Sequence, residues 1–300
     1  MKIAISGSTG LIGRALTAHL RAGGHEIIVL VRSENQAIDS NHCLWQPDSG
    51  IGQPEKLNRL DAVVHLAGRG IADHRWSKRE KDLIRASRVD ATQRLCHDLA
   101  KLPHPPKTFL SASAVGIYGN RGDEPVSESR PSARDFLAGL VRDWEAASER
   151  LTARGIRVVH ARFGIVLSPD GGALAKMLPL FRWGLGSKLG SGRQYWSWIS
   201  LDDAVRALEL LLTHEECRGP FNIVAPHPVS NAEFTRTLAR ILHRTRFLPV
   251  PALPLRWILG EFADAALLAS CRAVPQRLIG AGFHFTAPTL AEALSVLVKR

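Results

Sequence analysis

The stretch Gly7-Ser8-Thr9-Gly10-Leu11-Ile12-Gly13 decides the fold of this 300-residue chain. It follows a short apolar run at residues 3–5 and precedes apolar residues at helical spacing as far as Leu20. In a strand–turn–helix unit of this kind, the glycines permit a tight turn and let backbone N–H groups approach a pyrophosphate. The helix N-terminus then favours the negative charge. We predict that a dinucleotide binds here, the alternative being a purely structural turn.

The same unit predicts the architecture of the chain. Gly23-Gly24 ends the helix, and a second apolar run at 27–31 completes a strand–helix–strand unit of about thirty residues, the size of a right-handed parallel crossover. Three more strands and two long helical stretches follow in alternation, which predicts an α/β fold, a doubly wound parallel Rossmann sheet. The expected strands are 62–66, 108–111 and 157–161, and the expected helices are 77–100 and 134–153.

The pattern loosens after Gly171-Gly172, and this divides the chain. We predict a nucleotide-binding Rossmann domain at 1–165, completed by sheet segments around 193–224. Residues 166–245 are expected to form insertions on the substrate side, interrupted by prolines and glycines before a helix that opens at Asp202. Residues 246–300 are expected to form a small helical C-terminal domain.

Arg32 stands at the end of the second strand, where an NAD site would carry an acidic residue for the ribose hydroxyls. A guanidinium cannot accept those hydrogen bonds, but it can pair bidentately with a 2′-phosphate and stack on adenine. We therefore expect NADP(H) rather than NAD(H). Two alternatives stay open: Arg32 is a solvated strand-end residue, or Glu34 is the ribose acceptor.

Composition sets the broad class. Hydrophobic residues make up 45% and charged residues 22%, which is ordinary for a globular protein, and no apolar run approaches the ~20 residues of a membrane span. The N-terminus passes straight into the glycine turn without an apolar leader, so we expect a cytoplasmic protein. The four cysteines lack C-x-x-C spacing, and we predict no metal site.

The formal net charge of +11 favours an anionic partner. A phosphorylated cofactor or a nucleotide-linked substrate would suit this charge, and so would nucleic acid. Six basic residues cluster on one expected helix, but Glu80 and Asp82 interrupt them and Trp76 alone offers a stacking surface. We therefore predict no nucleic-acid binding. The six are Arg75, Lys78, Arg79, Lys81, Arg85 and Arg88.

Several further segments resemble the extended short-chain dehydrogenase/reductases, specifically the NAD-dependent epimerase/dehydratase family. The resemblance lies in 61–68 (D-A-V-V-H-L-A-G), 111–119 (S-A-S, then I-Y-G), 162–167, 198–203 and 221–223. The tail at 259–261 and 272–283 is similar to one atypical subgroup, described as sugar-nucleotide epimerases with an extra C-terminal domain. The resemblance implies a cofactor site formed by Gly7, Thr9, Gly10, Leu11, Ile12, Gly13, Arg32, Leu66, Ala67, Gly68, Ser111 and Phe163.

The chain departs from the family at its catalytic motif. Classical members carry Tyr-x-x-x-Lys on the helix after the Ser strand, whereas this helix has Phe136 and Leu140 at the corresponding spacing. The phenol and the ammonium that lowers its pKa are thus both missing. Ser113 and Tyr118 are the remaining catalytic candidates, although Tyr118 could simply hydrogen-bond within its loop. We interpret His65, on an apolar strand, as a core residue rather than a catalyst.

A glycine-rich stretch at 186–195 is basic and aromatic and is a candidate substrate loop. Within it, Lys188 and Arg193 could bind a phosphate or carboxylate of a small-molecule substrate, unless the stretch is only a surface hairpin. Two functions follow: an NADP(H)-dependent oxidoreductase or epimerase-like enzyme, or a non-catalytic NADP(H)-binding redox sensor or scaffold. The resemblance also implies a homodimer through the two long helices.

Overall fold

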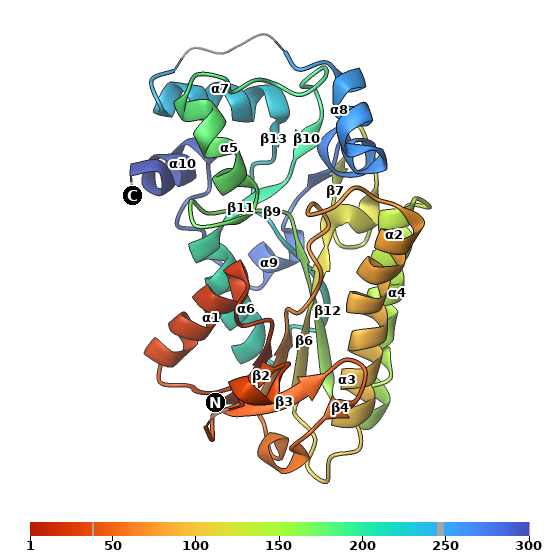
Figure 1. Ribbon diagram of the computed structural model, residues 1–300. Coiled ribbons are helices and arrows are strands. Elements are labelled where there is room, and N and C mark those ends of the chain that lie inside the picture. Colours follow the sequence, from red (N-terminus) through yellow and green to blue (C-terminus); the bar gives the residue numbers. More distant parts are fainter. Residues whose placement is uncertain (38, 245–248, 300) are drawn as a thin grey trace.

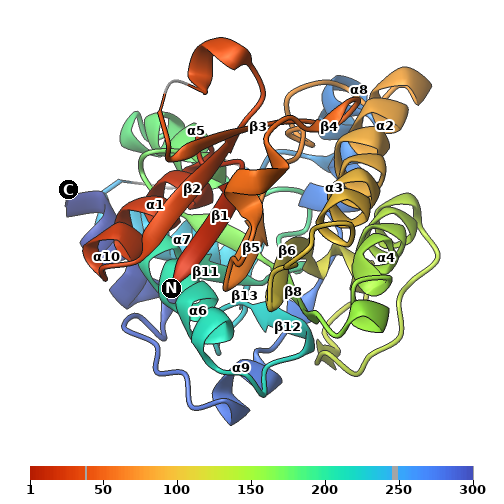
Figure 2. The same cartoon turned by 90° about the horizontal axis from the view of Figure 1, so that it is seen from below.

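A computed structural model describes residues 1–37, 39–244 and 249–299 of the chain. Its centre is one eight-stranded sheet in which every neighbouring pair is parallel except β3 and β4 (Figures 1 and 2). This order is that of a doubly wound Rossmann sheet, which confirms the predicted fold class. Across the sheet the strands are β4 (Gly50–Ile51), β3 (His42–Gln46), β2 (Glu26–Val31), β1 (Lys2–Ser6), β5 (Ala62–His65), β6 (Thr108–Ala114), β8 (Arg157–Phe163) and β12 (Gly219–Ile223).

Alternate residues of the buried strands enter two separate cores. Ile3 and Ile5 of β1 pack under helices α1 (Leu11–Ala22) and α6 (Leu201–Thr213), whereas Ala4 points to the other face. That other face is covered by α2 (Lys78–Arg85), α3 (Ala91–Leu99) and α4 (Phe136–Glu149), as Figure 2 shows. Parallel strands buried on both faces need apolar residues at every position, which explains the continuous apolar runs.

The first strand–helix–strand unit follows its sequence signals closely. The β1 residues Ile3 and Ala4 pair in register with Ile27 and Ile28 of β2. The helix between them ends at Ala22, and Gly24 has a φ of 80°, a left-handed conformation that favours glycine at a helix end. The predicted strands at 62–66, 108–111 and 157–161 are likewise present as β5, β6 and β8.

The expected helix at 77–100 is interrupted. A π-helical segment, η3 (Ala86–Asp90), lies between α2 and α3, and it places one extra residue in the turn. Such π segments are rare and frequently mark functional sites. The other short helices are η1 (Glu34–Gln36), η2 (Pro54–Leu57), η4 (Val115–Tyr118), η5 (Thr152–Arg154) and η6 (Ala263–Leu267).

Most of the remaining elements gather at one end of the sheet, beyond the carboxyl ends of its strands, whereas α9 packs beside β12 (Figure 1). Several of them share a third core in which Leu174, Phe234 and Leu294 come from three different helices, two of them before residue 245 and one after it. The three-part division of the chain stays a prediction; residues 245–248 and 300 lie outside the described ranges. These elements are α5 (Gly172–Arg182), α7 (Asn231–Ile241), α8 (Ala252–Leu259), α9 (Gln276–Gly280), α10 (Leu290–Lys299), β7 (Pro125–Val126), β9 (Ile165–Leu167), β10 (Tyr195–Trp196), β11 (Trp198–Ser200), β13 (Val229–Ser230) and β14 (Arg272–Ala273).

Candidate functional site

The turn between β1 and α1 is built so tightly that only glycine fits. Gly7 has a φ of 72°, and a Cβ added to it would lie 2.7 Å from the carbonyl carbon of Leu66. A Cβ on Gly13 would collide with the carbonyl oxygen of Gly7. Gly10 donates its N–H to that same oxygen at 3.0 Å. The glycine spacing therefore serves close backbone approach between the turn, the helix and the neighbouring strand end.

The N-terminus of α1 has no side-chain cap. Its first turn contains no acidic residue, and its N-cap is Gly10. By contrast, α6 is capped by the Ser200 hydroxyl and α4 by the Asp135 carboxylate. No side chain of the turn accepts a hydrogen bond from the first N–H groups of α1. Free N–H groups at a helix start are the arrangement that binds phosphate.

A second uncapped helix faces this turn. The N-cap of α5 is Gly171, and the first turn of α5 also lacks an acidic residue. A Cβ on Gly171 would lie 3.2 Å from the Leu11 side chain, so the two helix starts are neighbours. Further along α5, Lys176 pairs with Asp73 at 3.6 Å. Two positive helix ends therefore lie next to each other at the glycine turn.

Arg32 directly follows β2, and its side chain is exposed. It makes no ion pair with any residue in the described ranges, while its carbonyl oxygen accepts a hydrogen bond from Gln46 Nε2 at 3.1 Å. Glu34, the rival ribose acceptor, is exposed in η1 two residues later. Both side chains lie at the carboxyl edge of the sheet, next to the strand that carries the glycine turn.

The other predicted cofactor residues occupy neighbouring strand ends. Leu66 continues β5 and donates its N–H to the Ser6 carbonyl at 3.2 Å, and Ala67 and Gly68 follow it. Ser111 is buried in β6, with its hydroxyl on the carbonyl of Ala112. Phe163 ends β8 at the α1–α6 core. Leu11 and Ile12 begin α1, and Thr9 is exposed in the turn. All of these residues lie along one edge of the sheet.

The place of the missing catalytic pair is apolar. Phe136 packs edge-on against Trp76, with ring centroids 5.3 Å apart, and Leu140 is buried in the same cluster. Neither residue can donate or accept a proton. The chemistry of the Tyr-x-x-x-Lys pair is thus absent from this helix.

A buried ionic network stands beside it instead. Arg162 on β8 makes a bidentate pair with Glu145 on α4, at 2.8 Å for both Nε and Nη2. The Ser113 hydroxyl donates to Glu145 Oε1 at 2.6 Å. Burial alone would raise the pKa of Glu145, but the Arg162 guanidinium lowers it below its usual range. The carboxylate is therefore held ionised, and the Ser113 proton is committed to it.

Tyr118 belongs to the same network, which engages its hydroxyl on both sides. Its side chain is fully buried, and its hydroxyl donates to Asn222 Oδ1 at 2.8 Å while accepting from Arg162 Nη1 at 2.9 Å. Burial raises its pKa to about 12. The alternative from sequence was a hydrogen bond within the Tyr118 loop, whereas the two partners of this hydroxyl lie on β12 and β8. The network extends to Glu128, whose carboxylate accepts the Asn222 N–H at 3.0 Å.

Sequence reasoning missed Glu145 and Glu128 altogether. Arg162 and Asn222 were recognised only as members of two segments that resemble the family, and no role was predicted for either. The available signal was Arg162 itself, a charged residue in a mostly apolar strand. A buried arginine requires an acidic partner or carbonyl oxygens. That signal could indicate a partner but could not identify it.

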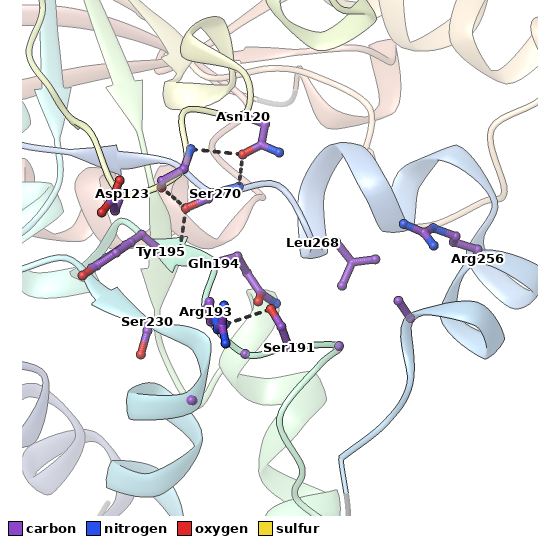
Figure 3. A pocket seen from close by; sticks show the side chains of 15 residues that line it. Asn120, Asp123, Ser191, Arg193, Gln194, Tyr195, Ser230, Arg256, Leu268 and Ser270 are labelled. Carbon is purple, nitrogen blue, oxygen red and sulfur yellow. Dashed lines mark hydrogen bonds between the residues drawn. The ribbon is translucent and has the colours of Figure 1, made fainter.

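The predicted substrate loop lines a cavity of about 790 Å³ (Figure 3). Gly190, Ser191, Gly192, Arg193 and Tyr195 form one wall. Other walls come from the turn after η4, from α8 and from the segment before β14, and they contribute Asn120, Asp123, Arg256, Leu268 and Ser270.

The two basic residues of the loop, Lys188 and Arg193, lie in different places. The exposed Arg193 side chain contributes to the lining of this cavity. Lys188 is not among the lining residues; its Nζ donates to the Ser191 carbonyl at 3.4 Å, and its stem packs against Gly192. The structure thus brings Arg193 to the cavity and uses Lys188 within the loop.

Other predicted features take ordinary positions. His65 is buried, with Nδ1 2.6 Å from the Ser6 hydroxyl, and burial lowers its pKa to about 4. In the basic helix, Lys81 and Arg85 pair with Glu261 and Asp143, so the row of charges is partly neutralised. Among the residues that the structure describes, no His, Cys, Asp and Glu side chains gather into a metal-binding group. No described helix is long and apolar enough to cross a membrane.

The sheet order and the glycine turn define a Rossmann-type dinucleotide-binding protein. Residues 3–224 match the NAD dependent epimerase/dehydratase family, and residues 250–297 match a domain of unknown function, DUF1731. An epimerase family protein of Mycobacterium tuberculosis is 46% identical over 298 residues, covering 99% of this chain and 98% of that protein. The chain therefore belongs to the NAD dependent epimerase/dehydratase family.

Two solved structures extend the comparison. The human epimerase family protein SDR39U1, crystallised with NADPH, superposes with a TM-score of 0.92 at 33% identity, covering all of both chains. A nucleoside-diphosphate sugar epimerase from Corynebacterium glutamicum gives a TM-score of 0.80 at 36% identity, over 99% of this chain and 58% of that one.

Proposed function

We propose that this chain binds NADP(H) and acts as an oxidoreductase or epimerase-like enzyme on a small, anionic or nucleotide-linked substrate. The observation that carries the proposal is the uncapped start of α1, reached by a glycine turn in which Gly7 and Gly13 admit no side chain. A pyrophosphate would supply the acceptor that this helix lacks. The human relative crystallised with NADPH supports the same choice of cofactor.

Arg32 is proposed to bind the 2′-phosphate. Its guanidinium is exposed at the end of β2 and free of ion pairs within the described ranges, so it is available to a ligand. Glu34 on η1 is less suited to NADP(H), because a carboxylate repels a phosphate dianion. NADP(H), when bound, supplies a nicotinamide that can give or take a hydride.

Ser113 is proposed to receive a hydrogen bond from the substrate rather than to donate one. Its proton already lies on Glu145, which Arg162 holds ionised. The free lone pairs of the Ser113 oxygen can accept a hydrogen bond from a substrate hydroxyl and so orient it. Arg193 in the cavity is proposed to bind an anionic part of the substrate.

One observation favours a second function. Phe136 and Leu140 replace the acid/base pair, and Tyr118 is engaged on both sides. A protein with this geometry could hold NADP(H) without turning over, as a redox sensor or scaffold.

The two functions are separated by turnover assays on the full chain. The protein is incubated with NADPH and panels of carbonyl compounds, quinones and nucleotide sugars, and NADPH oxidation and nucleotide-sugar interconversion are both followed. The enzyme proposal expects sustained turnover with at least one class, strongly reduced in Ser113→Ala and unchanged in Ser295→Ala, a serine on α10 whose hydroxyl donates to the Glu292 carbonyl. Binding of NADPH without turnover of any class would favour the sensor.

A further inference from the structure

Arg88 lies on the π-helical segment η3, at the centre of the interrupted helix between α2 and α3. Its guanidinium carbon is 3.5 Å from the position that a Cβ on Gly68 would occupy, and its two terminal nitrogens are 3.6 and 3.7 Å from that position. Gly68 lies in the segment that directly follows β5. The π turn thus places the Arg88 guanidinium next to the end of β5, the strand beside the one that carries the glycine turn.

The guanidinium has no acidic partner. No carboxylate of the described residues pairs with it, and its hydrogen bonds are long: 3.3 Å to the Ser87 hydroxyl and 3.5 Å to the Ile84 carbonyl. The Trp144 ring lies 5.3 Å away on another side. Burial lowers the pKa of Arg88 to about 10, which still leaves the side chain fully charged at neutral pH.

Two other buried arginines show how this chain normally satisfies such a charge. Arg157 donates to three carbonyl oxygens at 2.7 to 2.8 Å, and Arg162 makes its bidentate pair with Glu145. Arg88 is partly buried and has neither arrangement. A partly desolvated cation without strong partners costs stability, and an anionic ligand would offset that cost.

The surroundings of Gly68 hold this cation in place. The Ser87 hydroxyl accepts the Arg69 N–H at 3.1 Å and donates to the Ile84 carbonyl at 2.8 Å, which ties the strand end to the π turn. Strand β5 lies between β1, which carries the glycine turn, and β6, which carries Ser113. Arg88 therefore stands between the proposed pyrophosphate site and the proposed substrate contact.

We propose that Arg88 is an anion-binding residue at the carboxyl edge of the sheet, whose guanidinium binds a phosphate or carboxylate oxygen of a ligand lying over Gly68. The inference rests on the proposed NADP(H) function. The anionic oxygen has two sources with the same chemistry, the dinucleotide itself or the substrate. Neither source involves Arg32, which lies two strands away at the end of β2.

The test compares wild type with Arg88→Met, which keeps a long apolar stem against Trp144 but removes the charge. Arg85→Met is the matched control, because Arg85 lies three residues earlier, is exposed and pairs with Asp143 at 2.6 Å. Three quantities are measured on each full chain: the melting temperature without ligand, the Kd for NADPH by nicotinamide fluorescence, and the Kd of the NADPH complex for inorganic phosphate and malonate.

We expect Arg88→Met to melt at or above the wild-type temperature, since an unpaired buried charge is removed. If the dinucleotide supplies the anion, its Kd for NADPH rises about ten- to hundredfold, the range for a charge-assisted hydrogen bond. If the substrate supplies it, the NADPH Kd is unchanged and binding of phosphate or malonate to the complex is lost. Arg85→Met should change none of these quantities.

The proposal is overturned if Arg88→Met binds NADPH, phosphate and malonate as wild type does, whatever its melting temperature. A lower melting temperature with unchanged binding would assign Arg88 a purely structural role. Failure of wild type itself to bind NADPH would instead overturn the proposed function, so the two failures are distinguishable.

Discussion

The glycine turn and the edge of the sheet around Ser113 lie two strands apart and differ in what forms them. At the turn, backbone geometry makes the site: Gly7, Gly10 and Gly13 bring N–H groups together and no side chain is needed. Around Ser113, side chains from a helix and a strand make a buried ionic network in place of the family's acid/base pair. Binding and chemistry are therefore separable, and here only the binding half follows the family pattern.

The largest expected effect comes from breaking the turn. Gly13→Ala places a Cβ on the Gly7 carbonyl oxygen and should abolish detectable NADPH binding, a loss of about a thousandfold or more, because backbone cannot move aside cheaply. Titration with nicotinamide fluorescence measures it. Gly280→Ala is the control, since a Cβ there meets nothing within 4 Å. Equal NADPH affinity in the two variants would show that the turn is not the cofactor site.

The second effect falls on the network. Glu145→Gln leaves the buried Arg162 without its charge partner and should lower the free energy of unfolding by about 3–5 kcal/mol. Urea unfolding measures it, with Arg256→Met, which breaks the exposed pair with Asp264, as a control expected to show little change. NADPH affinity of the folded variant should stay within about threefold of wild type. A larger loss of affinity would contradict the separation of the two regions.

The same carboxylate predicts a pH dependence. Because the folded pKa of Glu145 is lowered, its contribution to stability is present above the unfolded value of about 4.3 and is lost as pH falls through the folded pKa. Unfolding free energies of wild type and Glu145→Gln should therefore begin to converge as the pH falls below about 4.3. Parallel curves down to pH 2 would mean that the pKa of Glu145 is not lowered by folding.

A smaller effect is expected at Tyr118. Removing its hydroxyl in Tyr118→Phe leaves Asn222 Oδ1 and one Arg162 nitrogen without this partner and should cost about 1–3 kcal/mol of stability. Any turnover detected with wild type should persist in the folded variant. Loss of turnover without loss of stability would restore Tyr118 as a proton donor.

The contrast between the two regions also marks what the sequence could predict. The strands, the first helix and the glycine turn depend on residues close together in the chain, such as the apolar runs and Gly23-Gly24, and these were predicted correctly. Strand β3 was not, because its three apolar residues, Cys43 to Trp45, are flanked by polar ones and include no β-branched residue. The Glu145–Arg162 pair joins a helix to a strand, and the π turn at Arg88 adds one residue inside a regular pattern; neither has a local signal.

The central claim, that the turn holds a phosphorylated dinucleotide selected by Arg32, is tested most directly by the ratio of the Kd for NADH to that for NADPH. Wild type should prefer NADPH by about ten- to hundredfold, and Arg32→Asp should reverse the preference, since a carboxylate accepts from ribose hydroxyls but repels a phosphate. Tighter binding of NADH by wild type, or an unchanged ratio in Arg32→Asp, would contradict the account.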